Sequence, residues 1–165
     1  MKRLTFVGLL VLCTLSASPF TLAQDWAKAT LEKSPRHREW VTVKHGDRSV
    51  ETLLVYPEGK NKTPVVVVIH EIFGMTDWVE DLADQVAAAG YITVAPDLLS
   101  GLGPNGGRSS SFPEGKTMEA VSHLNADQIT ADLNAVADYA LKLPASSGKL
   151  FAARGLAGAP RRDAR

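Results

Sequence analysis

The residues best placed to do chemistry are His70-Glu71-Ile72-Phe73-Gly74, which follow directly on the run Val65–Ile69. Every residue of that run is β-branched, which is typical of a strand buried on both faces in a parallel sheet. Loops at the carboxyl ends of parallel strands build ligand sites in α/β folds. Backbone N–H groups in such a turn can stabilise a developing oxyanion, and a carboxylate there can hold a nucleophile or its base. The alternative is that Glu71 is a solvated turn residue and His70 a packed imidazole.

Two motifs suggest a cofactor but lack the context that a cofactor needs. His70-Glu71 starts like a zinc-protease motif, which requires a second histidine one helical turn later, and Gly74 occupies that position. The segment Gly101–Gly106 has the spacing of a dinucleotide-binding turn, which must lie directly between a strand and a helix. Here Pro104 continues a loop instead. We therefore expect neither a metal nor another cofactor.

Arg108 is a second candidate site residue. It lies in the segment 98–115, which is rich in Gly, Ser and Pro and has no sustained period, so we predict a long loop. Such loops in compact domains are more often functional than idle. The guanidinium of Arg108 can bind a substrate carboxylate through two parallel hydrogen bonds. A simply solvated arginine is the alternative.

The elements around these residues follow an α/β pattern. Strand, helix and strand succeed one another within about 30 residues, as in the βαβ unit of a parallel sheet. The first predicted elements are a β-hairpin (39–43 and 50–56, with the turn signal His45-Gly46-Asp47) and a strand at 65–69. A helix capped by Asp77 and ended by Gly90 follows, and then a strand at 91–95 and the loop. After the loop we predict a helix that begins with an Asn125–Gln128 capping box and is ended by Pro144 and Gly148, and the start of a strand at 149–153.

Residues 1–23 are predicted to be an export signal. Two basic residues precede the apolar stretch Leu4–Leu15, and Thr21-Leu22-Ala23 places small residues at −3 and −1 of a cleavage site before Gln24. A membrane anchor needs roughly 20 unbroken apolar residues, and Ser16 and Pro19 interrupt this run too soon. We expect an exported, periplasmic or secreted protein that is not membrane-bound once the signal is removed.

The amino-acid composition limits the classes of partner that we expect. Cleavage would remove Cys13, the single cysteine, which leaves no disulfide and no cysteine nucleophile. It would also remove two of the 18 basic residues, leaving 16 against 18 acidic ones, so nothing favours nucleic-acid binding. We expect a small-molecule partner. Residues 24–38 are a polar lead-in compatible with a helix.

The last stretch of the chain changes character. Of the 14 residues Ala152–Arg165, 12 are Ala, Gly, Pro or Arg, without helix or strand periodicity. A basic flexible tail is one interpretation. A shifted reading frame is the other, because these four residue types are encoded by GC-rich codons. The composition alone does not favour either.

Three consecutive segments resemble the dienelactone hydrolase (carboxymethylenebutenolidase) family: Val65–Gly74, the helix that ends at Ala89, and Gly90–Leu99 with its Ala-Pro-Asp-Leu ending. The resemblance covers roughly residues 40–150, the N-terminal part of the family, and 98–108 looks like an exported subgroup. It implies an α/β-hydrolase fold with a mostly parallel sheet, and hydrolysis of a lactone or carboxylic ester through a Cys-Asp-His triad. The resemblance also implies that the Glu71 carboxylate contacts the nucleophile and that the Ile72 N–H contributes to the oxyanion hole.

The family pattern ends where the nucleophile belongs. The family has a Gly-x-Cys-x-Gly-Gly turn after the strand that 149–153 begins, and counting from Gly155 puts Ala157 at the nucleophile position. A methyl group cannot attack a carbonyl. The family's Asp and His fall beyond Arg165. We therefore expect a partial domain at 39–151, truncated before the nucleophile turn, and an aberrant tail at 152–165 that favours the frame-shifted interpretation.

Three functional readings follow from this departure. The first is a family hydrolase by ancestry that is inactive as this polypeptide. The second is a non-catalytic periplasmic module that uses the same cleft to bind a small molecule or a partner. The third is a pseudogene-like product without a function of its own. A half-built sheet would leave a strand edge uncovered, which favours aggregation.

Overall fold

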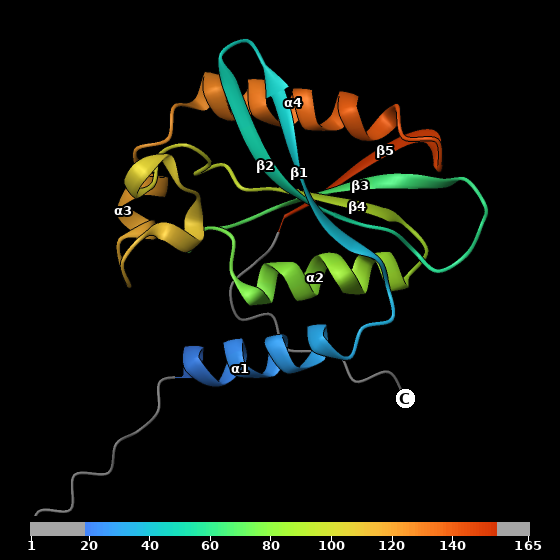
Figure 1. Ribbon diagram of the computed structural model, residues 1–165, viewed down its shortest axis with the longest axis horizontal. Coiled ribbons are helices and arrows are strands. Elements are labelled where there is room, and N and C mark those ends of the chain that lie inside the picture. The colour runs from blue at the N-terminus through green and yellow to red at the C-terminus, as the bar shows by residue number, and fades with distance from the viewer. Residues whose placement is uncertain (1–18, 155–165) are drawn as a thin grey trace, which may run out of the picture.

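One five-stranded sheet with helices on both faces forms the body of the protein (Figure 1). The structure is a computed structural model and describes residues 19–154. Helix α4 covers one face of the sheet, and α2 covers the other, with α1 packed outside it (Figure 1). The elements are α1 (Pro19–Glu32), β1 (Arg38–His45), β2 (Arg48–Val55), β3 (Thr63–Ile69), α2 (Asp77–Ala88), β4 (Ile92–Pro96), the 3₁₀ turns η1 (Pro104–Gly106) and η2 (Ser109–Ser111), α3 (Thr117–Ser122), α4 (Ala126–Leu141) and β5 (Ser146–Arg154).

The strand order β1-β2-β4-β3-β5 combines a hairpin with a parallel half-sheet. β1 and β2 pair antiparallel and are joined by Gly46 and Asp47, which confirms the predicted hairpin. β2 pairs antiparallel with β4, whereas β4, β3 and β5 run parallel. The sheet is therefore mixed, and its parallel half has β3 at the centre, as the βαβ pattern predicts.

The alternation of side chains along β3 divides the core into two layers. Val65 and Val67 pack toward α4 beside Val136, whereas Val66 and Val68 pack toward α2 beside Val79. All four valines are buried, as the unbroken β-branched run predicts. Burying a valine side chain stabilises the fold by roughly 1.5–3 kcal/mol, so β3 contributes apolar packing to the core on both faces of the sheet.

Helix α1 is fastened to α2 by buried contacts at and beyond its C-terminal end. Ala27 and Leu31 are buried, and the Asp84 carboxylate of α2 accepts hydrogen bonds from Ser34 Oγ (2.6 Å) and Arg36 Nε (3.1 Å). The hydrogen bond to Asp84 raises the pKa of Arg36. α1 begins at Pro19, ahead of the predicted cleavage position, and residues 1–18 of the predicted signal lie outside the described residues.

Two predicted helix starts differ in detail from the structure. The cap of α2 is Thr76, whose hydroxyl accepts from the Val79 N–H (3.4 Å), and Asp77 is the first helical residue. Asn125 caps α4 as predicted, but Gln128 does not complete a capping box. Its side-chain amide donates to the buried carboxylate of Asp132 one turn along (2.8 Å), and among the described residues no hydrogen bond from the Asn125 N–H to the Gln128 side chain is found.

Two further differences concern the second half of the chain. α3 was not predicted, and α4 already ends at Leu141. β5 begins at Ser146, so Gly148 lies inside the strand rather than ending the helix. Its φ of 78° fits the register shift between β3 and β5, which is a β-bulge. Ala152, Ala153 and Arg154, the start of the predicted tail, pair with β3, and residues 155–165 lie outside the described residues.

β5 is an edge strand within the described part of the chain. Leu150 and Phe151 point to opposite faces of the sheet and are 42% and 55% exposed. No helix between residues 19 and 154 is long and apolar enough to cross a membrane.

Candidate active-site turn

The turn after β3 is tightly closed and depends on glycine at its end. Glu71 and Gly74 form an isolated antiparallel bridge, and the Gly74 N–H donates to the Glu71 carbonyl (3.0 Å). Gly74 has a φ of +71°, and a Cβ at this position would lie 2.5 Å from Ser109 Oγ. Any side chain here would be strained and would clash, so Gly74 lets the turn lie against the loop after β4.

His70 fixes the turn from inside. Its Nε2 accepts a hydrogen bond from the Leu98 N–H (3.1 Å), so the ring proton lies on Nδ1, which donates to the Glu71 carbonyl (2.9 Å). The side chain is buried. Burial lowers the pKa of His70 from its ordinary value of 6.5. The neutral ring thus joins the ends of β3 and β4, which is the packed-imidazole alternative for this residue.

Protonation of His70 is expected to destabilise the fold. Because its pKa is lower in the folded state, the unfolded chain binds the proton more readily, and the stabilisation present above pH 6.5 is lost as the pH falls below it. Between pH 7 and pH 5 the unfolding free energy of the wild type should fall more steeply than that of His70→Gln, by at most about 1.4 kcal/mol per pH unit. Urea unfolding at several pH values measures both slopes, and equal slopes would contradict the assignment.

A buried pair, Asp97 and Ser109, braces the turn from the other side. Asp97 accepts hydrogen bonds from the Ser109 hydroxyl (2.7 Å), the Ser109 N–H (2.9 Å) and the Leu99 N–H (3.1 Å). The Ser109 hydroxyl in turn accepts from the Met75 N–H (3.0 Å), directly after Gly74. The segment predicted as a loop is therefore anchored at Ser109 to the candidate site.

Ser109→Ala is expected to lower the unfolding free energy by about 1–3 kcal/mol, because it leaves the buried Met75 N–H without its acceptor. Ser110→Ala is the matched control, since Ser110 is the exposed neighbour in the same 3₁₀ turn. Hydrogen exchange at Met75 should accelerate in the first variant and not in the second. Unchanged exchange in Ser109→Ala would exclude the bracing role.

The two residues with implied catalytic roles lie at the outer side of this turn. Glu71 is half-buried and the Ile72 side chain is 49% exposed. Within residues 19–154 no acceptor is found for the Ile72 N–H. A backbone donor held in a rigid turn at the carboxyl end of β3 is the arrangement that an oxyanion hole requires.

Arg108 does not extend into solvent. Its guanidinium carbon lies 3.5 Å from the ring centroid of Trp40 on β1, a cation–π contact. Glu80 on the first turn of α2 faces the same region; burial raises its pKa, whereas the charges of Arg108 and Arg38 act against that rise. Arg108 is thus held at the edge of the site on the α2 face, and a role in substrate binding remains a prediction.

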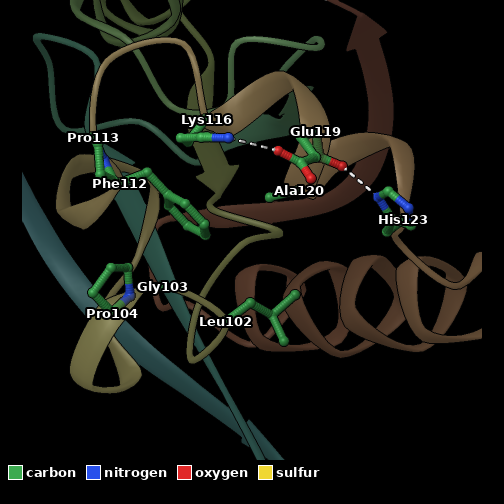
Figure 2. A pocket seen from close by; sticks show the side chains of 9 residues that line it. All are labelled: Leu102, Gly103, Pro104, Phe112, Pro113, Lys116, Glu119, Ala120 and His123. Carbon is green, nitrogen blue, oxygen red and sulfur yellow. Dashed lines mark hydrogen bonds and ion pairs between the residues drawn. The ribbon is translucent and has the colours of Figure 1, made fainter.

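A hollow separates the loop after β4 from α3 (Figure 2). None of the residues that line it belongs to the turn 70–74. Within the described residues no group of three or more His, Cys, Asp or Glu side chains is arranged to hold a metal ion.

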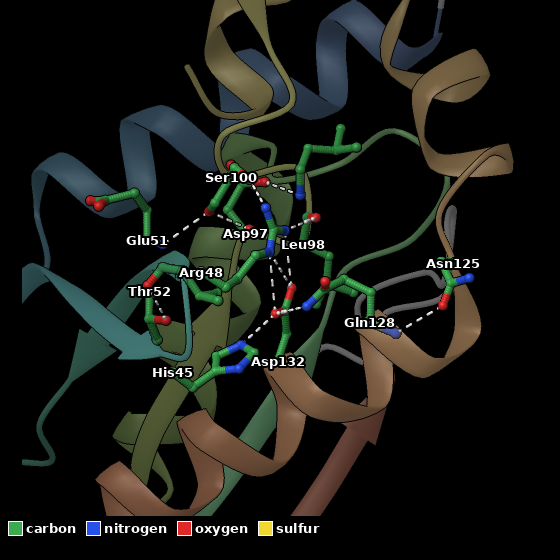
Figure 3. Close-up of polar contacts among 12 residues, drawn as sticks. His45, Arg48, Glu51, Thr52, Asp97, Leu98, Ser100, Asn125, Gln128 and Asp132 are labelled. Atoms are coloured by element: carbon green, nitrogen blue, oxygen red, sulfur yellow. Dashed lines mark hydrogen bonds and ion pairs between the residues drawn. The ribbon is translucent and has the colours of Figure 1, made fainter. Parts of the chain in front are cut away.

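A charged cluster on the α4 side ties the hairpin to the same loop (Figure 3). Asp132 is 1% exposed and accepts from Arg48 Nη2 (3.0 Å), His45 Nε2 (2.7 Å) and Gln128 Nε2 (2.8 Å). Arg48 also donates to the Ser100 carbonyl. Sequence reasoning missed this cluster, because its partners are up to 87 residues apart and share no motif.

The layered sheet, the parallel half with its βαβ unit and the turn at the end of β3 define the α/β-hydrolase class. Solved structures agree with this fold. A candidate dienelactone hydrolase from Klebsiella pneumoniae superposes with a TM-score of 0.62 at 23% identity, over 72% of this chain and 49% of that one. An acylaminoacyl peptidase superposes with a TM-score of 0.52 at 18% identity, over 79% of this chain and 21% of that one.

The dienelactone hydrolase family model matches residues 50–156, and the chain belongs to that family. A candidate carboxymethylenebutenolidase from Synechocystis is 31% identical over 111 residues, which cover 63% of this chain and 43% of the relative. A candidate hydrolase fragment from Escherichia coli, YghX, is 48% identical over 60 residues, 36% of this chain and 51% of the relative. The chain spans about half the length of these relatives.

Proposed function

We propose that this chain carries the oxyanion-side half of a site that hydrolyses a carboxylic ester or lactone. The observation that carries the proposal is the Ile72 N–H, which has no acceptor within residues 19–154 and lies in a turn braced by His70, Gly74 and Ser109. Membership of the dienelactone hydrolase family supports the reaction class.

In this proposal each residue of the turn has one task. The substrate carbonyl oxygen accepts a hydrogen bond from the Ile72 N–H, which stabilises the charge that develops when a nucleophile attacks. The Glu71 carboxylate contacts that nucleophile. Arg108, already oriented by Trp40, binds a substrate carboxylate. The attacking group itself is not among these residues.

We further propose that the 165-residue polypeptide does not turn over substrate. Residues 155–165 contain no cysteine, serine or histidine, and counting from Gly155 would put Ala157 at the position of the family's nucleophile. Removing a nucleophile leaves only the residual effect of binding and the oxyanion hole. A non-catalytic module that binds a small molecule or a partner in the same cleft is the alternative. Export, proposed from residues 1–23, would place either activity outside the cytoplasm.

A chimera tests the reaction class. Residues 1–154 of this chain are joined to the part of the Synechocystis relative that follows its matched region, and hydrolysis of 4-nitrophenyl acetate is measured. We expect turnover that falls by roughly 10²-fold on Glu71→Ala and is unchanged by Glu58→Ala, an exposed glutamate outside the turn. Circular dichroism establishes first that the chimera unfolds cooperatively. A folded chimera without turnover, or one indifferent to Glu71→Ala, would contradict the proposal.

A further inference from the structure

One asparagine of this chain is followed by glycine, the neighbour that most favours a spontaneous change of the side chain. Of the four asparagines, only Asn105 precedes a glycine, and the others precede lysine or alanine. The backbone nitrogen of the next residue can attack an asparagine side chain, and glycine hinders this attack least because it has no Cβ. Asn105 and Gly106 are both exposed, so solvent water reaches them.

Asn105 and Gly106 form the centre of a tight turn in the loop after β4, directly after Pro104 (Figure 2). Their φ values are 56° and 74°, and the Gly107 N–H donates to the Pro104 carbonyl (3.1 Å). Left-handed φ values at both central positions make this the mirror image of an ordinary β-turn, the kind that favours Asn-Gly. The dipeptide therefore suits the turn, although it is also the asparagine sequence that reacts most readily.

The reaction exchanges the side-chain amide for a carboxylate. The Gly106 nitrogen attacks Asn105 Cγ, so that the N–Cγ bond forms, the Cγ–Nδ2 bond breaks, and ammonia leaves with the proton of the Gly106 N–H. Water then opens the resulting five-membered succinimide. Its addition at Cγ gives aspartate, whereas its addition at the backbone carbonyl carbon of Asn105 gives isoaspartate, in which the chain continues through Cγ. Water is consumed and ammonia is released, without oxidation or reduction.

The closed turn keeps the reacting atoms apart. The Gly106 N–H donates to the Gly103 carbonyl (3.0 Å), so the attacking nitrogen is engaged elsewhere. Ring closure also brings Cβ of Asn105 and the Gly106 nitrogen to the same side of the Cα–C bond, which requires a ψ far from the 29° that Asn105 has here. The ring can therefore close only when the turn opens, and local opening sets the rate.

The turn is held shut by its packing against Ser111 of η2. The Gly103 N–H donates to the Gly107 carbonyl (3.0 Å), and a Cβ on Gly107 would lie 2.6 Å from Ser111 Cβ. Gly107 has a φ of −75°, which any residue adopts, so only this contact opposes a side chain there. A methyl group on Gly107 should thus push the turn open without straining its own backbone.

We propose that Asn105 is a site of spontaneous deamidation whose rate is controlled by the opening of the turn 103–107. The aspartate product keeps the turn, because aspartate tolerates a left-handed φ as asparagine does. The isoaspartate product inserts an extra carbon into the backbone, so the hydrogen bonds of the turn are lost. Either product adds a carboxylate three residues before Arg108. The site is separate from the proposed hydrolytic function and does not depend on it.

Peptide mass mapping of the purified chain, incubated near neutral pH, measures deamidation at each asparagine. We expect the mass gain of an amide-to-acid exchange at Asn105 and none over the same period at Asn61, which is exposed but precedes Lys62. In guanidinium chloride Asn105 should react roughly tenfold faster or more, because the turn is then open. Asn105→Asp already carries the product and should show no further change in this peptide.

Gly107→Ala tests the control by the turn. In a variant whose circular dichroism is native, Asn105 should react several-fold faster than in the wild type, whereas in guanidinium chloride the two chains should react alike. Ser110→Ala, at the exposed neighbour of Ser111, is the matched control and should leave the native rate unchanged.

Deamidation at Asn105 that is no faster than at Asn61 would overturn the site itself. Equal rates in the folded and the unfolded wild type would overturn the control by the turn, as would an unchanged rate in folded Gly107→Ala. The comparison of folded with unfolded wild type decides this point even if Gly107→Ala does not fold. Because the readout is mass rather than turnover, each result is independent of whether the turn at Glu71 supports hydrolysis.

Discussion

Asp132→Ala is expected to lower the unfolding free energy by about 3–5 kcal/mol, a large part of the stability of a domain of this size. Asp132 is 1% exposed, and it is the anionic partner of the Arg48 guanidinium, whose side chain is only 16% exposed. Removing the carboxylate leaves this cation half-buried with carbonyl oxygens alone. The Gln128 amide and the His45 ring lose an acceptor at the same time.

Urea unfolding followed by circular dichroism measures this effect. Asp138→Ala is the matched control, because Asp138 is an exposed carboxylate two turns along the same helix. It should change the unfolding free energy by less than about 0.5 kcal/mol. A loss in Asp132→Ala that is no larger than that of the control would mean that the Arg48 cluster in Figure 3 does not hold the hairpin against α4.

Asp97→Ala is expected to have the second largest effect, about 2–4 kcal/mol. Asp97 is fully buried and accepts three hydrogen bonds, two of them from backbone N–H groups of Leu99 and Ser109. Both N–H groups would be left without acceptors. Since Ser109 braces the turn through Met75, the variant should also loosen the residues that carry Glu71 and Ile72.

Asp97→Asn separates charge from hydrogen bonding. One oxygen remains to accept from Leu99 and the Ser109 hydroxyl, but the amide group then faces the Ser109 N–H, donor against donor. In urea unfolding we expect the unfolding free energy of Asp97→Asn to lie between those of the wild type and Asp97→Ala. Faster hydrogen exchange at Met75 should accompany both variants, and normal exchange in Asp97→Ala would show that the turn is held in another way.

The sequence predicted the parts of the fold that depend on local patterning. The β-branched run of β3, the hairpin around Gly46 and the apolar faces of α2 and α4 each have a period that distinguishes strand from helix. The family resemblance carried by Val65–Gly74 and Gly90–Leu99 predicted the fold class, which the solved structures bear out.

The features that the sequence did not predict are contacts between residues far apart in the chain and choices between two local interactions that are both possible. Ser109 lies 12 residues from Asp97 in a stretch without period, and nothing local distinguishes it from its serine neighbours. Thr76 and Asp77 are both good capping residues, and only the helix start decides between them. Gln128 has the spacing of a capping box, but its side-chain amide donates to Asp132, a carboxylate that Arg48 of the hairpin also contacts.

Hydrolysis of 4-nitrophenyl acetate by the purified 165-residue chain, measured beside its Glu71→Ala variant, tests most directly whether this polypeptide contains a nucleophile. We predict that the wild type shows no more than the slow, residual rate that binding and a backbone donor alone can give, because the roles proposed for Ile72 and Glu71 include no attacking group. Saturable turnover by the wild type that disappears in Glu71→Ala would contradict this, since the chain would then contain a nucleophile of its own.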